Sequence, residues 1–443
     1  MRQQNHFDSI VIGGGSAGSA FANTAANLGG RILLIERGAL GGTCVNRGCV
    51  PKKILWAAGR TVRNAVAGYE CNILDSAPRV DFGRLVARRD ARIAEIRQSF
   101  DDRLNRSGVT VVRGEASLLD ARTLRVGDKQ YHAKNTVIAT GAVPVMPQIE
   151  GADYLANSTD VLSWRTLPRD MVILGGGYIG TEFASIFNAL GVDVTLIETD
   201  GRILAGYPTG LADHVIDSLR AAGVRVLLHE SLNRIEKIND RLAYALRSGA
   251  DGTADAIVAA TGRTPDIAQL GPFAGGLRLA ESGALAVDDQ FMTSAQGVYA
   301  IGDAADRMPL TPVAKADGTT LAKILHGSGC RPIDLDLVPK TAFSYPPAAV
   351  VGKQADGPFA ENTVIRLADQ VLHPQPECTR HYYRLDADTQ DRIIGAQFMS
   401  DGAEDMIALA SALIAAQAPR RVLTQATGIH PSFAEEFFPD TVD

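Results

Sequence analysis

The chain opens with an apolar run that ends in a glycine-rich turn. Residues 8–18 read Asp-Ser-Ile-Val-Ile-Gly-Gly-Gly-Ser-Ala-Gly. A continuous apolar run is typical of a buried strand, and clustered glycines are typical of a tight turn. The spacing after the turn predicts a helix over 19–28, and residues 31–36 form a second apolar run that ends at Glu36. This order predicts a nucleotide-binding unit of strand, turn, helix and strand.

The same pattern recurs later in the chain at a constant offset. The apolar run, glycine turn, helix and acid-ended strand return over residues 171–198. Gly175 follows Gly13 by 162 residues, and Glu198 follows Glu36 by the same 162. A chance cluster of glycines would seldom keep this register, so the sequence predicts two copies of one unit.

Each copy is followed by a strand that ends in Ala-Thr-Gly. These strands are residues 137–141 and 258–262, and we expect each one to close its nucleotide-binding unit. Between the first glycine turn and its closing strand, a polar helix is predicted over 82–107.

The pattern changes from Lys340 onward. Short strands and one helix are predicted there, at 364–367, 382–385, 393–398 and 403–417. This succession predicts a separate α+β domain at the end of the chain.

Composition narrows the class of protein. The 443 residues are 46% hydrophobic and 21% charged, which is typical of a globular protein of about three domains. A net charge of -6 without a Lys/Arg tract does not point to nucleic acid or an anionic membrane. Residues 1–9 lack an apolar signal core, and no long apolar stretch predicts a membrane span.

The cysteine count indicates a reducing compartment. The chain has five cysteines, an odd number, and Cys71, Cys330 and Cys378 are widely scattered. This is not the pattern of a secreted disulfide framework, so we expect a cytoplasmic protein.

The two glycine turns predict two dinucleotide sites. Their Gly-x-Gly-x-x-Gly residues are Gly13, Gly15 and Gly18, and Gly175, Gly177 and Gly180. The glycines let backbone N–H groups approach a pyrophosphate, and the following helix adds the positive end of its dipole. Glu36 and Glu198 stand where a carboxylate accepts hydrogen bonds from ribose hydroxyls. Two such sites in one chain favour a tightly held flavin and an exchanging nicotinamide.

A close cysteine pair follows the first nucleotide unit. Cys44 and Cys49 are five residues apart within Gly41–Lys53, a spacing that suits a bridge across one distorted helical turn. It is not the spacing of a zinc knuckle, and no second Cys or His pair lies nearby. Two buried thiols are the alternative, but the glycines and lysines around the pair favour a redox disulfide.

Together these motifs resemble the glutathione-reductase-like class I pyridine nucleotide–disulfide oxidoreductases over essentially the whole chain. The resemblance rests on the cysteine motif, both glycine turns, both Ala-Thr-Gly turns, Gly302-Asp303, Thr311-Pro-Val313 and His430-Pro-x-x-x-Glu435. It implies an α/β fold with two Rossmann-like domains, for FAD and NAD, plus a C-terminal α+β dimerisation domain. The expected domains are residues 1–143 for FAD, 144–264 for NAD, 265–334 as a return to the FAD domain, and 335–443 for dimerisation.

The resemblance also implies roles for the reacting residues. Cys49 matches the flavin-side thiol, and Cys44 matches the outer thiol that attacks the substrate. Lys52 and Glu182 match an ion pair beside the flavin, although such residues also form ordinary solvated pairs.

The acid/base group is implied at the end of the chain. His430 matches the catalytic acid/base supplied by the other subunit of a homodimer, and Glu435 matches the carboxylate that orients it. A lone histidine is usually structural, but an imidazole can hold a proton in one step and return it in the next.

Further residues are implied as cofactor contacts. Tyr178 matches a lid over the nicotinamide pocket, and Asp303 matches the acid that binds the flavin ribityl chain. The other matching contacts are Ser16, Gly42, Thr43, Lys53, Thr140, Gly141, Ile179, Gly262, Arg263, Gly302 and Thr311.

The glutathione-binding positions depart from the family. Ser16 is kept, but the aligned arginines and tyrosines are replaced by Asn23, Arg92, Phe100 and Thr319. Two cationic clamps are lost, which predicts weak binding of oxidised glutathione and a substrate with fewer carboxylates, for example an imidazole thiol. Trp56 and Tyr69 are candidates for the pocket rim, or else for the core.

These expectations define an FAD-dependent enzyme that prefers NADH and reduces a small disulfide as a homodimer. Glu198, where NADPH-using members carry arginine, favours a free ribose 2′-hydroxyl over a phosphate. The alternatives are a glutathione reductase proper, a lipoamide- or metal-ion-type reductase, and a redox-sensing flavoprotein without turnover.

Overall fold

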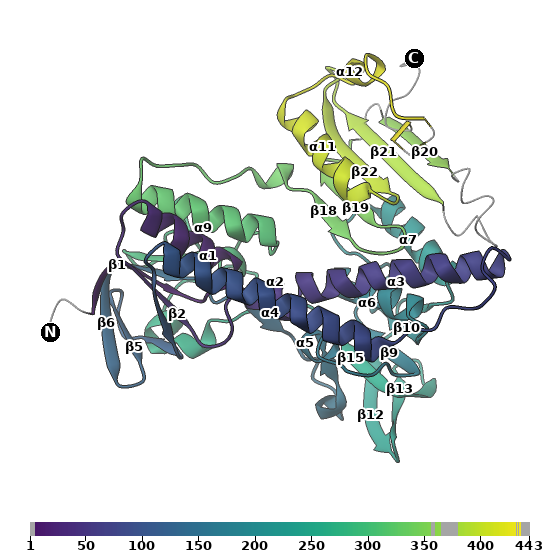
Figure 1. The fold of residues 1–443 in the computed structure, drawn as a ribbon, viewed down its shortest axis with the longest axis horizontal. Coiled ribbons are helices and arrows are strands. Elements are labelled where there is room, and N and C mark those ends of the chain that lie inside the picture. Colours follow the sequence, from purple (N-terminus) through teal and green to yellow (C-terminus); the bar gives the residue numbers. More distant parts are fainter. Residues whose placement is uncertain (1–4, 356–358, 365–379, 431, 433, 436–443) are drawn as a thin grey trace. The chain divides into compact units, whose positions relative to one another are not determined.

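A computed structural model describes residues 5–355, 359–364, 380–430, 432, 434 and 435 (Figure 1). The chain divides into two compact units. The first unit comprises Met1–Lys53, Val86–Val145 and Arg263–Ile333, and the second comprises Ile54–Leu85, Met146–Gly262 and Asp334–Asp443.

The first unit is built on a seven-stranded sheet in the order β3-β2-β1-β6-β5-β4, with β17 also paired to β6. Its strands are β1 (His6–Ile12), β2 (Ile32–Glu36), β3 (Thr110–Arg113), β4 (Ala116–Leu118), β5 (Thr123–Val126), β6 (Lys129–Ile138) and β17 (Val298–Ala300). Strands β1, β2, β3, β6 and β17 run parallel, whereas β4 and β5 are antiparallel. Ile10, Val11 and Leu34 are fully buried, as expected for parallel strands covered on both faces.

The other elements of the first unit surround this sheet. They are α1 (Ser16–Asn27), α2 (Gly42–Arg47), β7 (Ala142–Pro144), β16 (Arg263–Pro265), η2 (Ala268–Leu270), α8 (Pro272–Gly275), η3 (Gly302–Ala304) and α9 (Thr311–His326). The long helices α3 (Cys49–Glu70) and α4 (Phe82–Arg106) each contribute residues to both units.

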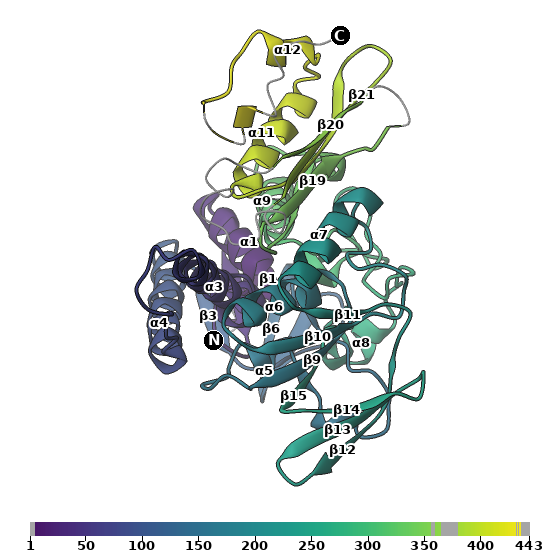
Figure 2. The same ribbon diagram turned by 90° about the vertical axis from the view of Figure 1, so that its right-hand side faces the viewer.

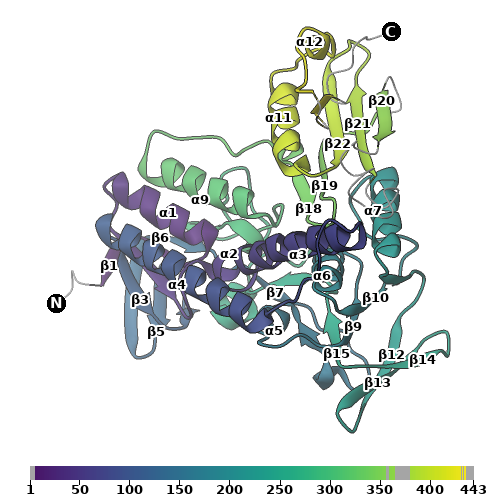
Figure 3. The ribbon, with the colours of Figure 1, turned by 45° about the vertical axis from the view of Figure 1, so that its right-hand side comes forward.

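Helices α1 and α9 pack side by side in the first unit (Figures 1 and 3). Their contact depends on Gly318, where a Cβ atom would lie 2.2 Å from the carbonyl oxygen of Ala17. Farther along, the rings of Phe21 and His326 meet edge to face with centroids 6.1 Å apart. Helix-to-helix contact this close requires a residue without a side chain at Gly318.

The second unit repeats the parallel core of the first. Its five-stranded parallel sheet has the order β11-β10-β9-β15-β8, so β11-β10-β9-β15 corresponds to β3-β2-β1-β6. Its elements are η1 (Ala152–Tyr154), β8 (Ala156–Asn157), α5 (Ser158–Val161), β9 (Asp170–Leu174), α6 (Tyr178–Ala189), β10 (Asp193–Ile197), α7 (Thr209–Ala221), β11 (Arg225–Leu227) and β15 (Ala256–Ala259). A three-stranded antiparallel sheet of β12 (Leu232–Ile238), β13 (Arg241–Leu246) and β14 (Asp251–Ala254) is visible beside it in Figure 2.

The C-terminal part of the second unit is a five-stranded antiparallel sheet with α11 packed on one face. Its elements are η4 (Leu335–Leu337), β18 (Lys340–Ala342), β19 (Ala348–Gly352), β20 (Phe359–Val364), β21 (His381–Ala387), β22 (Ile393–Met399), α11 (Ala403–Ala415) and α12 (Arg421–Thr424). Of the strand expected over 364–367, only Val364 is described: it is the last residue of β20 and pairs with His381. Residues 365–367 lie outside the described residues.

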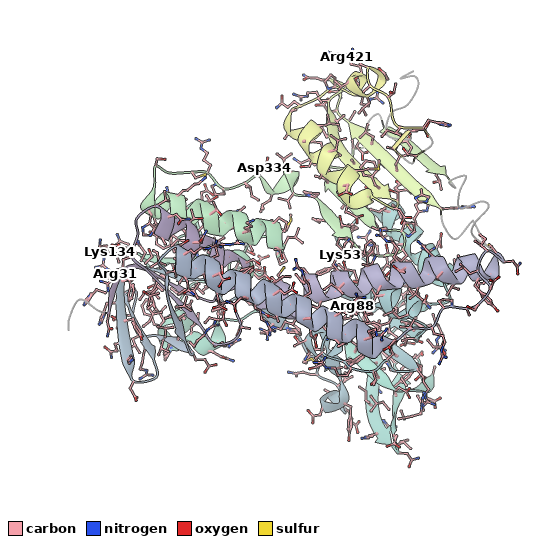
Figure 4. All side chains as sticks on the ribbon, viewed as in Figure 1. Arg31, Lys53, Arg88, Lys134, Asp334 and Arg421 are labelled. Carbon is pink, nitrogen blue, oxygen red and sulfur yellow. The ribbon has the colours of Figure 1, made fainter. Side chains whose placement is uncertain are left out.

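Charged side chains close the amino end of the first sheet. Arg31, just before β2, and Lys134, on β6, are labelled in Figure 4 and lie on either side of β1. The Asp8 carboxylate accepts hydrogen bonds from the backbone N–H of Arg31 at 3.0 Å and from Lys134 Nζ at 2.9 Å. These contacts lower the pKa of Asp8. These hydrogen bonds lie at the amino ends of the strands, whereas the glycine turns follow the opposite, carboxyl ends.

The fold predicted from the sequence is confirmed: two Rossmann-like units with one strand order and a C-terminal α+β domain. The residue boundaries expected for the domains stay predictions. Within the described part of the chain, no helix is long and apolar enough to cross a membrane.

Gly318→Ala tests the contact between α1 and α9. The added methyl group collides with the Ala17 carbonyl, so we expect a loss of about 1–3 kcal/mol in the free energy of unfolding and weaker flavin retention. Urea unfolding and bound-flavin absorbance measure both. Gly83→Ala is the control, because a Cβ there meets only the Asp81 carboxylate at 3.7 Å. Equal stability of the two variants would contradict this account of the packing.

Candidate active site

The two glycine turns are alike down to single hydrogen bonds. Gly14 N donates to Glu36 Oε2 at 2.6 Å, and Gly176 N donates to Glu198 Oε2 at 2.6 Å. Each acid is therefore fixed against its own turn by a backbone donor. This places a carboxylate beside each turn, as the sequence pattern predicts.

The last glycine of each turn is required by the protein itself. A Cβ on Gly18 would lie 1.9 Å from Gly13 O, and a Cβ on Gly180 would lie 1.9 Å from Gly175 O. Real atoms cannot approach so closely, so each helix starts directly against the preceding strand.

The middle glycine of each turn, Gly15 or Gly177, is explained in a different way. Gly177 has an ordinary φ of -63°, and nothing lies within 4 Å of the place where its Cβ would stand. Gly15, at φ -75°, would meet only the Cα of Gly42 at 3.7 Å. Neither backbone strain nor packing explains these two residues. Close approach of a bound pyrophosphate to the starts of α1 and α6 does explain them.

The first unit gathers polar groups that fit a flavin dinucleotide. Thr140 and Gly141 follow β6, and Gly302 and Asp303 follow the paired strand β17, so all four lie at one edge of the sheet. Among the described residues, Thr140 Oγ1 is buried and has no hydrogen-bond partner. Burial raises the pKa of Asp303, while the nearby Arg263 lowers it. A buried acceptor and an unsatisfied hydroxyl suit the hydroxyl-rich chain of FAD.

Arg263 and Thr43, two further predicted cofactor contacts, are hydrogen-bonded to each other in this unit. The Arg263 guanidinium donates to the backbone oxygen of Ala142 and, at 3.5 Å, to Thr43 Oγ1. Gly42, beside Thr43, has a φ of 58°, and a Cβ there would lie 2.6 Å from Gly15 Cα. The segment that leads to the cysteines therefore lies directly on the first glycine turn.

Cys44 and Cys49 lie on successive helices and are present as thiols. Helix α2 ends at Arg47, the φ of -152° and ψ of -116° at Gly48 interrupt the helical path, and α3 begins at Cys49. The hydrogen bond with Cys49, burial and the negative charge of Cys49 raise the pKa of Cys44 well above its ordinary value. A negative charge on Cys49 thus disfavours ionisation of Cys44. A thiolate at the first residue of a long helix is stabilised by the helix dipole.

Asn46 is a site residue that the sequence analysis missed. Its side-chain amide donates to the backbone oxygens of Gly42, Leu40 and Ala39 at 2.8, 3.0 and 3.3 Å. Its own carbonyl accepts a hydrogen bond from Arg97 of α4. The amide thus braces the turn that carries Cys44. Its place in the cysteine motif, four residues after Gly42 on one helical turn, is the signal that would have found it.

Lys52 and Lys53 lie in the first turn of α3, after Cys49. Lys52 belongs to the first unit and Glu182 to the second, so their ion pair stays a prediction. In the second unit, buried Glu182 accepts a hydrogen bond from the backbone N–H of Phe343 at 3.1 Å.

The residues at the glutathione-binding positions make contacts within the first unit. Asn23 Oδ1 accepts from Ser107 Oγ at 2.6 Å, and Thr319 Oγ1 donates to Lys315 O at 3.0 Å. Arg92 is exposed and pairs with Glu95, with Nη1 2.7 Å from Oε2. Phe100 is half-buried, packs against the core beneath α1 and lies under the Arg103 guanidinium.

Trp56 was a candidate either for the pocket rim or for the core, and the structure places it in a core. It is almost fully buried in the second unit, where its ring stacks on Tyr345 and its Nε1 donates to Ser344 O at 3.1 Å. Its indole is therefore part of a core. Tyr69 is exposed near the end of α3.

The second nucleotide site places two tyrosines near one acid. Tyr178 and Ile179 begin α6, and Tyr178 is exposed. The pKa of Tyr207 is raised by burial first, then by the Glu182 and Tyr178 groups. Tyr207 was not among the predicted residues. Gly262 follows β15 and leads into the first unit again.

His430 and Glu435, which the family resemblance implies as a pair, are in contact. His430 Nδ1 lies 2.7 Å from Glu435 Oε1, and the backbone N–H of Ser432 donates to Glu435 Oε2 at 2.9 Å. Both contacts lower the pKa of Glu435, the Ser432 contact more strongly. The His430 side chain is 84% exposed, so its free ring nitrogen faces outward. Pro431 and Phe433 of this motif lie outside the described residues.

Comparison with known proteins identifies the family. The model of the pyridine nucleotide-disulphide oxidoreductases matches residues 7–318. The chain belongs to this family. The family's dimerisation domain matches residues 338–440. The recognition made from the sequence motifs is therefore confirmed.

Relatives within the family span the whole chain. A glutathione reductase from Burkholderia cepacia is 33% identical over 444 residues, which cover 98% of each chain. A mercuric reductase from Lysinibacillus sphaericus is 30% identical and covers 92% of this chain and 77% of its own length. Among solved structures, the Cu(II) complex of the HOCl-induced flavoprotein disulfide reductase RclA from Escherichia coli has a TM-score of 0.87 at 28% identity, with 98% of both chains covered.

Membership of this family makes the chain a flavin-dependent disulfide oxidoreductase that uses FAD, and its dimerisation domain supports a homodimer. In the described residues, no group of three or more His, Cys, Asp or Glu is arranged to hold a metal ion.

Proposed function

We propose that this protein is an FAD- and NADH-dependent reductase of a low-molecular-weight disulfide other than glutathione. The observation that carries the proposal is the thiol pair: Cys49 is the first residue of α3, and its hydrogen bond and charge raise the pKa of Cys44. The roles of the site residues and the four expected domains belong to the same proposal. So does a cytoplasmic setting, which would keep both cysteines reducible.

Each partner in the thiol pair has one task. Bound FAD supplies the two-electron step that links the nicotinamide to the cysteines. The ionised Cys44 sulfur attacks one sulfur of the substrate, so that a Cys44–substrate disulfide forms while the substrate S–S bond breaks. The Cys49 thiolate then attacks Cys44, the Cys44–substrate bond breaks as the Cys44–Cys49 disulfide forms, and the second half of the substrate leaves as a thiolate that takes a proton from water. One disulfide becomes two thiols, and the cysteine pair is oxidised by two electrons.

The raised pKa of Cys44 means that this step needs a base. His430 of the partner subunit is the proposed group: it takes the Cys44 proton and returns it to the first departing thiol. The exposure of His430 and its bond to Glu435 support this role, because the carboxylate fixes the tautomer and the outer nitrogen stays available. The pair Lys52–Glu182 is proposed beside the flavin, and Tyr178 over the nicotinamide.

The preference for NADH rests on the Glu198 carboxylate. Its Oε2 accepts from Gly176 N, and its Oε1 accepts from Asp200 N at 3.0 Å. The carboxylate is thus fixed where it would repel a ribose phosphate. The nearest following arginine, Arg202, already donates from Nη1 to Thr209 Oγ1 at 2.6 Å.

The proposal against glutathione rests on the contacts of the altered positions. Asn23 and Thr319 each lie about two helical turns beyond the first residue of their helix, and each is engaged by a neighbour. Arg92 would have to leave Glu95, which costs at most about 1 kcal/mol for an exposed pair. The proposed substrate-binding site is therefore more neutral than one built from two arginines and two tyrosines. A zwitterionic or flat thiol such as an imidazole thiol suits it.

A metal-ion reductase is the second candidate. It is favoured by the mercuric reductase relatives and by the copper complex of RclA. Two thiols within hydrogen-bonding distance could hold one soft ion between them.

One substrate panel separates these functions. NADH oxidation is measured with oxidised glutathione, other small disulfides, lipoamide, Hg(II) and Cu(II). We expect a small non-glutathione disulfide to be turned over best, with kcat/KM for glutathione below about 10⁴ M⁻¹s⁻¹. A glutathione value within the usual enzymatic range of about 10⁴–10⁸ M⁻¹s⁻¹ would make the protein a glutathione reductase. Turnover of the ions alone would favour the second candidate, and no turnover at all would favour a redox sensor.

The nicotinamide preference is tested by comparing kcat/KM for NADH and NADPH. We expect NADH to be favoured about tenfold or more, which corresponds to ~1.4 kcal/mol from one repulsive charge pair. Glu198→Gln removes that charge and should shrink the ratio. Asp193→Asn is the control, because Asp193 is exposed at the amino end of the same strand. A wild-type preference for NADPH would contradict the proposal.

His430→Ala separates the two half-reactions. We expect flavin reduction by NADH to stay near the wild-type rate and disulfide turnover to fall by roughly 10²–10⁴-fold, the usual contribution of an acid/base group. Stopped-flow absorbance follows the first half and steady-state assays follow the second. His6→Ala, at an exposed residue of β1, is the control. Equal losses in both half-reactions would indicate a structural role instead.

A further inference from the structure

We infer that the hydroxyls of Ser16 and Thr311 hold the redox sulfurs in place, with Thr311 serving both sulfurs and Ser16 serving Cys44. This inference deepens the proposed function and rests on it. The two residues entered the sequence analysis only as cofactor or substrate contacts.

Thr311 is the first residue of α9. Its Oγ1 lies 3.3 Å from Cys49 Sγ, within the range of a hydroxyl–sulfur hydrogen bond. The same hydroxyl also hydrogen-bonds Cys44 and lowers the pKa of that thiol. One side chain therefore reaches both sulfurs.

Ser16 approaches the pair from another helix. It is the first residue of α1, directly after Gly15, and its hydroxyl hydrogen-bonds Cys44. This contact also lowers the pKa of Cys44. The starts of α1, α3 and α9 therefore meet at two sulfur atoms, and each helix brings the positive end of its dipole.

A hydroxyl carries one proton, so Thr311 can donate to only one sulfur at a time. While Cys49 is the charged sulfur, the Thr311 proton stabilises it. When the Cys44 proton leaves and its sulfur attacks the substrate, the Thr311 hydroxyl can rotate toward Cys44, where Ser16 already donates. The two hydroxyls offset the neighbouring charge that otherwise keeps Cys44 protonated.

The test measures the charge of each sulfur separately in the two-electron-reduced holoenzyme. The long-wavelength absorption band, followed against pH, reports the charge on Cys49. The rate of Cys44 alkylation by iodoacetamide, assigned by peptide mapping, reports the ionisation of Cys44. The variants are Thr311→Val, which keeps the shape and removes the hydroxyl, and Ser16→Ala. Thr311→Ser and Ser16→Thr restore each hydroxyl.

We expect Thr311→Val to raise the midpoint of both pH profiles by about one unit or more, the effect of one charge-assisted hydrogen bond. Ser16→Ala should raise the midpoint for alkylation of Cys44, the sulfur that its hydroxyl contacts. Both restoring variants should return to the wild-type profiles. Thr61→Ala is the control, because Thr61 Oγ1 lies on the same helix as Cys49 but donates only to Ala57 O, at 3.1 Å.

Unchanged profiles in flavin-bearing Thr311→Val or Ser16→Ala enzyme would overturn the inference and leave the proposed function standing. A wild-type enzyme whose cysteines NADH cannot reduce would instead overturn the proposed function, and the inference with it.

Discussion

Two helices of this protein begin so close to the preceding strand that a side chain cannot fit between them. Gly18 and Gly180 would each place a Cβ 1.9 Å from a carbonyl oxygen. This close approach puts the starts of α1 and α6 at the carboxyl edges of their sheets, where backbone donors and the helix dipole face a pyrophosphate. In the first unit, the same constraint aligns α1 with the turn of Gly42, which leads to Cys44. The chemistry of the cysteines therefore depends on the packing of a nucleotide site.

The two copies of the nucleotide-binding unit share a backbone but continue into different elements. Gly42 and Leu204 are 162 residues apart and have almost the same backbone, with φ of 58° and 54°. After Gly42 the first copy continues into the cysteine helices α2 and α3, whereas after Leu204 the second continues into α7. Leucine is rare at such a positive φ, and its N–H donates to Gly176 O at 2.7 Å, which holds the loop against the turn. The loop after the acid is thus fixed in both copies, and only the first one carries redox residues.

Much of this arrangement could be predicted from the sequence, because glycine spacing and apolar periodicity report local backbone geometry directly. The register of 162 residues predicts two copies of one unit, and the two sheets share a strand order; the family resemblance implies the pair of His430 and Glu435, which are in contact. Contacts that depend on tertiary packing could not be predicted in this way. From the sequence, Trp56 could belong either to a pocket rim or to a core. It lies in a core because it packs against Tyr345 and Ser344, which are almost three hundred residues away in the sequence. Asn46 and Ser16 act through partners that only the folded turn brings near.

The central claim is that Cys49 is the charged sulfur beside the flavin and Cys44 is the outer thiol. The most direct test is the absorbance at long wavelength of the Cys44→Ser and Cys49→Ser variants with their flavin oxidised. The account predicts a long-wavelength band in Cys44→Ser and none in Cys49→Ser. A band that persists in Cys49→Ser and disappears in Cys44→Ser would contradict it.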